Sequence, residues 1–189
     1  MRKRELLKKI QPLINIRIKL YSLFPRKFTR FLFYRSLKKR GYLGILKRYC
    51  LLKVVAKSCG NNVAVFDNTV ILNVENISFG DNVAVQPFCY LEGLGGIEIG
   101  NEVGLAHGVS VLSTSHNIER TDIPHTDQGI SKKSVKICDD VWLGCKSTIL
   151  MGIEIGKGAV IGANSVVTKD VSPYAVCVGS PAKEIRCRK

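Results

Sequence analysis

Large aliphatic residues recur every six positions through the C-terminal half of the chain. A second set of apolar or small residues lies four positions after each of them. The first set comprises Ile137, Leu143, Ile149, Ile155, Ile161 and Val167, and the second comprises Val141, Ser147, Ile153, Ala159, Ser165 and Val171. An earlier stretch has the same spacing at Phe79, Val85 and Leu91, shifts by two residues at 93–96, and resumes at Ile99, Leu105 and Val111.

A hydrophobic period of six is typical of a solenoid of short parallel strands, a β-helix. Each unit forms a strand and a turn, and it buries its aliphatic residue only by stacking on the next coil. An ordinary sheet of alternating strands would show a period of two instead. We therefore predict an all-β solenoid from about Val63 to Val178. The spacing alone leaves the handedness of the coil open.

The first 60 residues show a helical pattern instead. Pro25 and Gly41 are natural breaks between helices. We expect a helical extension over residues 1–60 and a β-helix domain over residues 61–189. Apolar residues recur every three or four positions, with cations between them, at Leu6, Ile10, Leu13, Ile14 and Ile18.

The formal net charge of +14 is concentrated in this extension. Residues 1–60 hold 18 Lys or Arg and one acidic residue (18 − 1 = +17), and residues 61–189 hold 11 and 14 (11 − 14 = −3). A basic amphipathic segment suits an anionic membrane surface, and the alternative is that its apolar stripe packs on the β-helix or on a neighbouring subunit. Because no RNA or DNA motif accompanies the charge, we do not expect nucleic-acid binding. An aromatic cluster lies among the cations, at Phe24, Phe28, Phe31, Leu32 and Phe33.

The cysteines and the N-terminal residues bear on location. Seven cysteines, an odd number without a CxxC pair, fit a reducing cytoplasm better than a disulfide framework or a zinc module. The first apolar stretch is interrupted by cations, so we do not expect a signal peptide, and no stretch approaches the roughly 18 apolar residues that a membrane-spanning helix needs. We expect a cytoplasmic protein, soluble or peripheral on the inner face of the membrane.

Val111 and Ile137 are 26 positions apart, and the six-residue rhythm fails for the 25 residues between them. A repeat fold does not need so long an excursion, and long loops on rigid scaffolds are often functional. We predict a protruding loop over about 113–134, which begins with the run STSHN. An imidazole in such a loop can act as a general base, which makes His116 the main catalytic candidate.

These features resemble the hexapeptide-repeat acetyltransferases, especially the maltose, galactoside and polysaccharide O-acetyltransferase branch. The similarity extends over roughly Asn76 to Arg186. It is carried by IGNEV at 99–103, VLSTSHN at 111–117, VKICDDVWLG at 135–144, GIEIGKGAVIGANSVVTKDV at 152–171 and VGSPAKEIR at 178–186. The resemblance implies a left-handed, triangular β-helix, acetyl-CoA as the acyl donor, and a homotrimer with its sites between subunits.

The resemblance also implies roles for single residues at the acceptor side. The family's catalytic histidine falls on His116, which would take the proton from a sugar hydroxyl as that oxygen attacks the acetyl thioester. Backbone N–H groups would then hold the oxyanion. Substrate-binding roles fall on Gln86, Asn117 and Trp142. Gln86 departs from the family's asparagine, so its longer amide either does the same work or meets a different acceptor, and Trp142 is alternatively a structural corner.

The cofactor-binding positions follow from the same resemblance. The pantetheine arm maps to Gly144, Cys145 and Ala163. The phosphates map to Thr168, Lys169, Lys183 and Arg186, of which the last three supply the cations that phosphates need. Because the resemblance implies direct transfer, Cys145 is expected to line the wall and not to act as a nucleophile. No metal is expected.

Other classes of function stay open at this point. Some hexapeptide-repeat proteins are γ-class carbonic anhydrases that bind zinc through histidines from two subunits. The three histidines here, His107, His116 and His125, have a spacing unlike those sites. A CoA-dependent N-acetyltransferase of an amino sugar or of serine, and a scaffold without catalysis, are further alternatives. The reading we favour is O-acetylation of a sugar or of a surface-polysaccharide intermediate, such as a lipid-linked glycan.

Overall fold

The computed structural model describes residues 3–189, with side-chain surroundings from Ile10 onward. Three helices come first: α1 (Lys3–Ser22), α2 (Arg26–Ser36) and α3 (Gly41–Val55). Pro25 directly precedes α2 and Gly41 opens α3, so both predicted breaks lie at helix ends. Among the described residues, no helix combines the length and the apolar character needed to cross a membrane.

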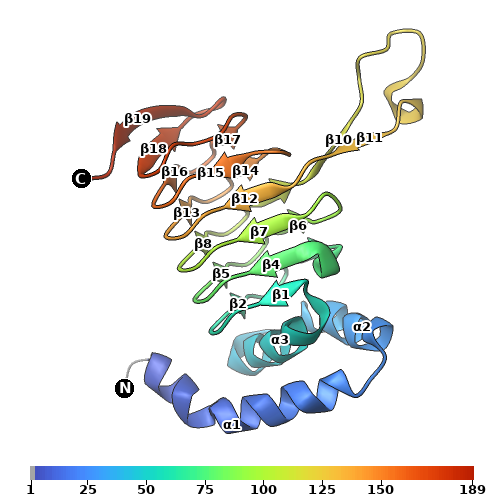
Figure 1. Cartoon of the computed structure of the whole chain (residues 1–189), viewed down its shortest axis with the longest axis vertical. Helices are drawn as coiled ribbons and strands as arrows, with labels where there is room; N and C mark the ends of the chain where they lie inside the picture. Colours follow the sequence, from blue (N-terminus) through green and yellow to red (C-terminus); the bar gives the residue numbers. More distant parts are fainter. Residues whose placement is uncertain (1–2) are drawn as a thin grey trace.

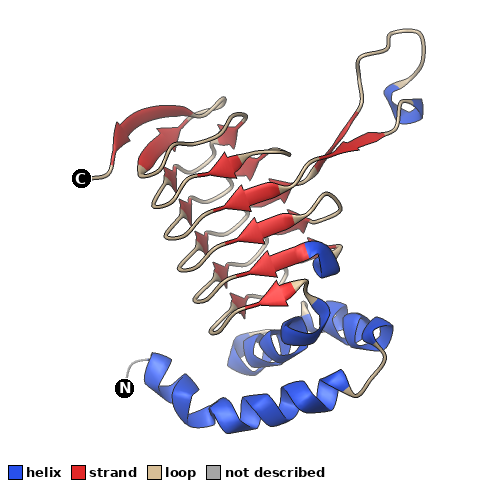
Figure 2. Ribbon diagram, viewed as in Figure 1, coloured by secondary structure: helices blue, strands red, loops and turns tan. Residues whose placement is uncertain are grey.

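Short parallel strands after the helices stack into three sheets, which confirms the predicted β-solenoid (Figures 1 and 2). Sheet A comprises β1 (Ser58–Cys59), β4 (Ile77–Phe79), β7 (Ile97–Ile99), β12 (Val135–Ile137) and β15 (Glu154–Ile155). Sheet B comprises β2 (Ala64–Val65), β5 (Ala84–Val85), β8 (Gly104–Leu105), β13 (Trp142–Leu143), β16 (Val160–Ile161), β18 (Ala175–Val178) and β19 (Lys183–Cys187). Sheet C comprises β3 (Val70–Leu72), β6 (Tyr90–Glu92), β9 (Ser110–Leu112), β14 (Thr148–Ile149) and β17 (Val166–Val167).

The core follows the predicted six-residue spacing. Every member of the two sets in the C-terminal half is buried, including the small polar residues Ser147 and Ser165. The earlier positions from Phe79 to Val111 are buried as well. Since each coil contributes its aliphatic residues to one continuous interior, the solenoid has a single hydrophobic core, and α3 packs against its first coil.

The turns between sheets are named here by the sheets they join. At the BC corner, between sheets B and C, every coil keeps the six-residue spacing. At the CA corner, between sheets C and A, the first three coils carry extra residues. Ile71 and Phe79 are eight positions apart, as are Leu91 and Ile99, while Val111 and Ile137 are 26 apart. These additions are the short helix η1 (Val74–Asn76), the segment 93–96, and the long loop predicted from the sequence.

Helix α1 differs from the prediction in one respect. Ile14 is buried and Ile10 and Ile18 pack against the core, so these three form the expected stripe. Leu13 was placed on the same stripe, which is wrong, because its side chain is 65% exposed. Leu6 belongs to the part of α1 whose side chains lie outside the described residues.

Arg48 of α3 closes the first end of the solenoid. Its side chain is fully buried, and it donates hydrogen bonds to the carbonyls of Val65 (2.6 Å), Ser36 (2.7 Å) and Lys39 (2.6 Å). Val65 ends the edge strand of sheet B, so its carbonyl has no further coil to bond. Burial lowers the pKa of Arg48 from its ordinary value.

Candidate active site

The long loop forms an antiparallel hairpin that projects from the CA corner (Figure 1). Its two strands are β10 (Thr114–His116) and β11 (Ile130–Lys132), and the short helix η2 (His125–Asp127) lies between them. His116 pairs in register with Ile130 at the end of β10, and its side chain is exposed. The predicted catalytic residue therefore stands at the solvent end of a regular strand.

A buried glutamate anchors the base of this hairpin. Glu92 lies in β6, one coil below the loop, and its carboxylate accepts hydrogen bonds from the Leu94 N–H (2.6 Å) and from the Thr114 hydroxyl (2.9 Å). The Ser113 hydroxyl donates to the Glu92 carbonyl oxygen (2.6 Å) and accepts from the Gly95 N–H (2.8 Å). Because Ser113 is fully buried and His116 follows three residues later, this network fixes where β10 leaves the solenoid.

Sequence reasoning missed Glu92. The signal was available, because Glu92 is an acidic residue at a strand end directly before the glycine-rich shift at 93–96. A carboxylate in that position is buried only if donors surround it. One donor, the Leu94 N–H, is local, but the others come from Ser113 and Thr114 at the loop entrance, which is distant along the chain.

Asn117 closes the hairpin with its own amide. Its N–H donates to the Gly129 carbonyl (3.0 Å) and its Nδ2 to the Gln128 carbonyl (2.9 Å), while its Oδ1 accepts from the Ser131 hydroxyl (2.5 Å). The amide thus stabilises the loop geometry beside His116. The substrate-binding role of Asn117 stays a prediction. In this structure Asn117 would act indirectly, because its side-chain amide and its backbone N–H hold the backbone of Gln128 and Gly129 in the hairpin.

Two further contacts order the tip of the loop. The rings of His116 and His125 meet edge to face, with centroids 5.6 Å apart. The guanidinium of Arg120 pairs with Asp122, and this contact lowers the pKa of that exposed carboxyl. Surface loops that are packed by their own side chains are frequently functional.

A second group of predicted residues lies along the BC corner. Gln86, Gly144 and Ala163 lie there on three coils, and the coil of Ala106 separates those of Gln86 and Gly144. The N–H groups of Gln86 and Gly144 each donate to a carbonyl of the next coil, those of Leu105 (3.0 Å) and Ile161 (2.8 Å). Coils approach so closely at this corner that a Cβ added to Gly144 would lie 2.7 Å from the Ala163 nitrogen. Cys145 is partly buried beside Gly144. At Gly144, Cys145 and Ala163 this edge presents backbone groups and small side chains.

Two aromatic side chains flank this edge. Trp142, in β13 of sheet B, is 57% exposed, and Phe88, in the BC turn after Gln86, is 66% exposed. Phe88 was not predicted from the sequence, because an aromatic residue between hexads reads as an ordinary turn position. The neighbouring Cys89 is buried, and burial raises the pKa of its thiol to about 11.

The predicted phosphate-binding residues lie near the C-terminal end of the solenoid. Thr168 and Lys169 follow β17, and Lys183 and Arg186 belong to β19, which pairs antiparallel with β18. The Ala182 N–H donates to the Val166 carbonyl (2.8 Å), which ties the start of β19 to sheet C. All four side chains are exposed. Three cations on one end of a coil stack form a suitable surface for a polyanionic group.

The predicted site residues therefore occupy two different edges of the triangular solenoid. His116 and Asn117 lie at the CA corner, whereas Gln86, Gly144, Cys145 and Ala163 lie at the BC corner. Sheet C separates the two edges, and its six-residue width is roughly 20 Å at ~3.3 Å per residue. A single chain does not bring the two groups together.

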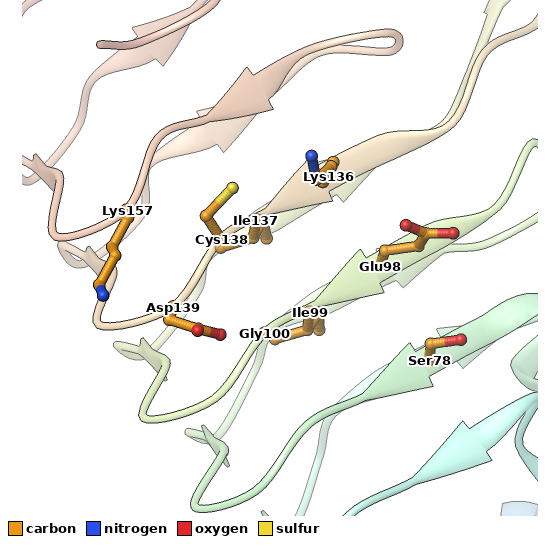
Figure 3. A pocket seen from close by; sticks show the side chains of 9 residues that line it. All are labelled: Ser78, Glu98, Ile99, Gly100, Lys136, Ile137, Cys138, Asp139 and Lys157. Carbon is orange, nitrogen blue, oxygen red and sulfur yellow. The ribbon is translucent and has the colours of Figure 1, made fainter. Parts of the chain in front are cut away.

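A shallow groove on sheet A lies apart from both edges (Figure 3). Its walls include Ser78, Glu98, Lys136, Cys138 and Lys157, none of which was predicted to act. Lys136 pairs with Glu154 (2.8 Å), and the Cys138 thiol contacts the same carboxylate. Burial and this contact with Glu154 together raise the pKa of the Cys138 thiol. The groove is a charged strand face and contains no part of the predicted chemistry.

The described residues contain no cluster of three or more His, Cys, Asp or Glu side chains suited to a metal ion. His107 lies in the BC turn after β8, whereas His116 and His125 lie in the hairpin. The three histidines are therefore not gathered within one chain.

Comparison with known proteins places the fold in a family. Residues 134–169 match the family described as bacterial transferase hexapeptide (six repeats). A crystal structure of a maltose O-acetyltransferase from Clostridium difficile 630 is 30% identical, with a TM-score of 0.71 over 87% of this chain and 86% of that one. A hexapeptide-repeat acetyltransferase from Vibrio cholerae O1 biovar eltor, complexed with acetyl coenzyme A, is 26% identical, with a TM-score of 0.75 over 87% of each chain.

Curated sequences agree with these structures. A probable acetyltransferase of Mycobacterium tuberculosis (strain ATCC 25618 / H37Rv) is 34% identical over 122 residues, which are 65% of this chain and 41% of that protein. The chain spans about half the length of the curated relatives it matches. On the combined similarity, the chain belongs to the hexapeptide-repeat acetyltransferase family, as its motifs implied.

Proposed function

We propose that this protein transfers an acetyl group from acetyl-CoA to a hydroxyl of a sugar or of a surface-polysaccharide intermediate. The observation that carries the proposal is the hairpin at the CA corner, which holds His116 exposed at the end of a strand whose base is fixed by Glu92. Family membership and the likeness to a maltose O-acetyltransferase support the reaction class and the sugar acceptor.

In the proposed reaction, His116 takes the proton from the acceptor hydroxyl as its oxygen attacks the thioester carbonyl. The C–O bond forms, the C–S bond breaks, and the thiolate of CoA leaves and takes up the proton that the imidazole holds. Backbone N–H groups stabilise the charge on the carbonyl oxygen in between. Gly144, Cys145 and Ala163 would line the pantetheine arm, and Lys169, Lys183 and Arg186 would neutralise the phosphates.

The arrangement of two edges supports a homotrimer with its sites between subunits. The hairpin of one subunit would then meet the BC corner of its neighbour. The outward rows of sheets B and C are uncharged over several coils, for example Ala84 and Gly104 on B and Ser110 and Thr148 on C, and each of these is partly buried already. The outward row of sheet A, with Glu98, Lys136 and Glu154, is charged and exposed. Uncharged faces suit an interface, and a charged one suits solvent.

Replacing the proposed base tests the reaction. We expect His116→Ala to keep the oligomeric mass of the parent and to lose acetyl transfer by about 10²- to 10⁴-fold. Lys157→Ala, in the groove on sheet A away from both edges, is the control, and it should keep most of the activity. Near wild-type turnover of His116→Ala in an acetyl-CoA consumption assay would refute the role.

Mixing inactive variants tests the shared site. In randomly assembled trimers of His116→Ala with Gln86→Ala, about a quarter of the sites would combine an intact hairpin with an intact BC corner, so activity should recover to that fraction. A mixture of His116→Ala with Asn117→Ala should not recover, because both changes lie in the same hairpin. Equal behaviour of the two mixtures would place the whole site within one chain.

The acceptor is tested with a panel that includes free sugars, lipid-linked saccharides, amino sugars and serine. O-acetylated products are expected, with sugars and lipid-linked saccharides as the best acceptors. A preference for an amino group would favour the alternative, an N-acetyltransferase. Zinc in stoichiometric amount together with CO₂ hydration activity would favour the alternative of a carbonic anhydrase.

A further inference from the structure

From Ile10 onward, where its side chains are described, helix α1 has two apolar faces, and one of these two packs on the rest of the chain. Ile14 is buried, and Ile10, Ile18 and Tyr21 pack partly buried against the core. A second stripe lies on another side of the helix, at Leu13 (65% exposed), Ile16 (64%) and Leu20 (52%). Residues three, four and seven apart share a helix face, and such an outer face is normally polar.

An aromatic row continues this second stripe into α2. Phe24, Phe28 and Phe31 are all about half exposed. The ring centroids of Phe24 and Phe28 lie 5.5 Å apart, and those of Phe28 and Phe31 lie 6.4 Å apart. Leu23, at 74% exposure, connects the two helices. Figure 1 shows α1 running across the end of the molecule, below α3 and away from the hairpin. We call this surface the outer stripe: Leu13, Ile16, Leu20, Leu23, Phe24, Phe28 and Phe31.

Cations border the outer stripe, and acidic residues are missing from its part of the sequence. Arg17, Lys19, Lys27 and Arg35 are exposed beside it, and the Arg35 guanidinium lies 5.7 Å from the centre of the Phe31 ring. No Asp or Glu occurs in the sequence between Glu5 and Asp67. The surface therefore combines exposed apolar side chains with charge of a single sign.

We infer that the outer stripe binds an anionic lipid bilayer, with α1 and α2 lying in the plane of the interface. Apolar side chains would enter the boundary between headgroups and acyl chains, and the flanking Arg and Lys would meet lipid phosphates. A protein partner of opposite charge is a weaker fit, because the outer stripe is spread over about 15 Å of α1 and about 9 Å of α2 and is not gathered at one place. The inference does not depend on the acetyl-transfer reaction, since binding is measured without substrate.

Vesicle flotation of the full chain tests the inference. Wild-type protein should float with vesicles of phosphatidylcholine and phosphatidylglycerol, should not float with phosphatidylcholine alone, and should be released by salt. The variant Leu13→Ser/Ile16→Ser/Leu20→Ser should bind at least about tenfold less. Since all three side chains are exposed, its helix content by circular dichroism should match the parent.

Matched controls separate the outer stripe from apolar exposure in general. The variant Leu72→Ser/Ile118→Ser/Ile185→Ser removes three exposed aliphatic side chains from the solenoid and its loop, and it should bind vesicles like the parent. Arg17→Gln/Lys19→Gln/Lys27→Gln should weaken binding, whereas Lys132→Gln/Lys157→Gln/Lys189→Gln should not. Failure of the wild type to float, or equal flotation of the stripe variant, would overturn the inference. A lower oligomeric mass of the stripe variant with unchanged flotation would assign the face to contacts between copies.

Discussion

The two corners that border sheet C are made from the same repeating backbone, yet they treat extra residues in opposite ways. At the BC corner every coil keeps the six-residue spacing, and one residue of each turn adopts a left-handed conformation: Asn68, Phe88, Gly108, Lys146 and Asn164. At the CA corner the first three coils add a short helix, a glycine-rich segment and the hairpin. The coil stack constrains the length of the turn at the BC corner, whereas the CA corner accommodates long insertions.

The largest expected effect comes from removing the addition at the CA corner. Thr114 and Lys132 are directly opposed in the hairpin, so an Asn-Gly turn can join them in place of residues 115–131. We expect the shortened protein to unfold at a similar denaturant concentration and to lose acetyl transfer by at least about 10³-fold, as expected for loss of the general base. The same two residues inserted between Cys145 and Lys146, at the BC corner, should lower the unfolding midpoint instead. Retained activity in the first variant would break the comparison.

A methyl group added at each corner should give a smaller difference of the same kind. Gly144→Ala places a Cβ 2.7 Å from backbone atoms of the next coil, and we expect it to lower the free energy of unfolding by about 3 kcal/mol. Gly129→Ala in the hairpin, with φ of +77° and no atom nearer than 3.9 Å, should lower it by about 1 kcal/mol. Urea denaturation followed by circular dichroism measures both. Equal losses would show that the corners are equally tolerant.

Glu92 links the hairpin to the coil below, and removing its charge should loosen that link. Glu92→Gln presents an amide to donors that now meet a carboxylate, so the free energy of unfolding should fall by about 2 kcal/mol. We expect kcat to fall by about tenfold, since His116 would be less well placed. Glu98→Gln, on the solvent face of sheet A, is the control and should change stability by less than about 0.5 kcal/mol. An unchanged kcat in Glu92→Gln would mean that the position of the hairpin does not depend on the Glu92 carboxylate.

The smallest effect concerns a strained turn residue at the BC corner. Lys146 has φ of +56°, a conformation that asparagine adopts more readily than lysine. Lys146→Asn should therefore raise the free energy of unfolding by about 0.5 kcal/mol. Lys132→Asn, in the extended strand β11, should bring no such gain. A loss of stability in Lys146→Asn would contradict the conformational argument.

The sequence predicts the solenoid well because its information is local. Within each six-residue unit, the spacing alone predicts which side chains point inward. The shift at 93–96 and the interruption after Val111 are visible in the sequence as breaks in this strict period. The start of the hairpin and the position of His116 follow from the same pattern. The two helix breaks at Pro25 and Gly41 are equally local signals.

What the sequence does not predict depends on contacts between distant segments. The buried carboxylate of Glu92 meets donors from the loop entrance 21 and 22 residues later. The position of Leu13 depends on which side of α1 faces α3, because its spacing is compatible with the packed stripe as well. The separation of the candidate residues onto two edges emerges only when the coils are stacked in space.

Arg48 gives the helical extension a second duty. An open end of a solenoid is a row of unpaired strand edges, which would template the addition of another solenoid end to end and lead to fibres. The Arg48 guanidinium of α3 binds the Val65 carbonyl in the edge strand β2 of sheet B, and in this way α3 blocks the addition of another solenoid. The helical extension that carries the outer stripe therefore also covers the N-terminal end of the solenoid. A variant that detaches them to test membrane contact would be expected to polymerise, which is why point substitutions on the stripe are the cleaner probe.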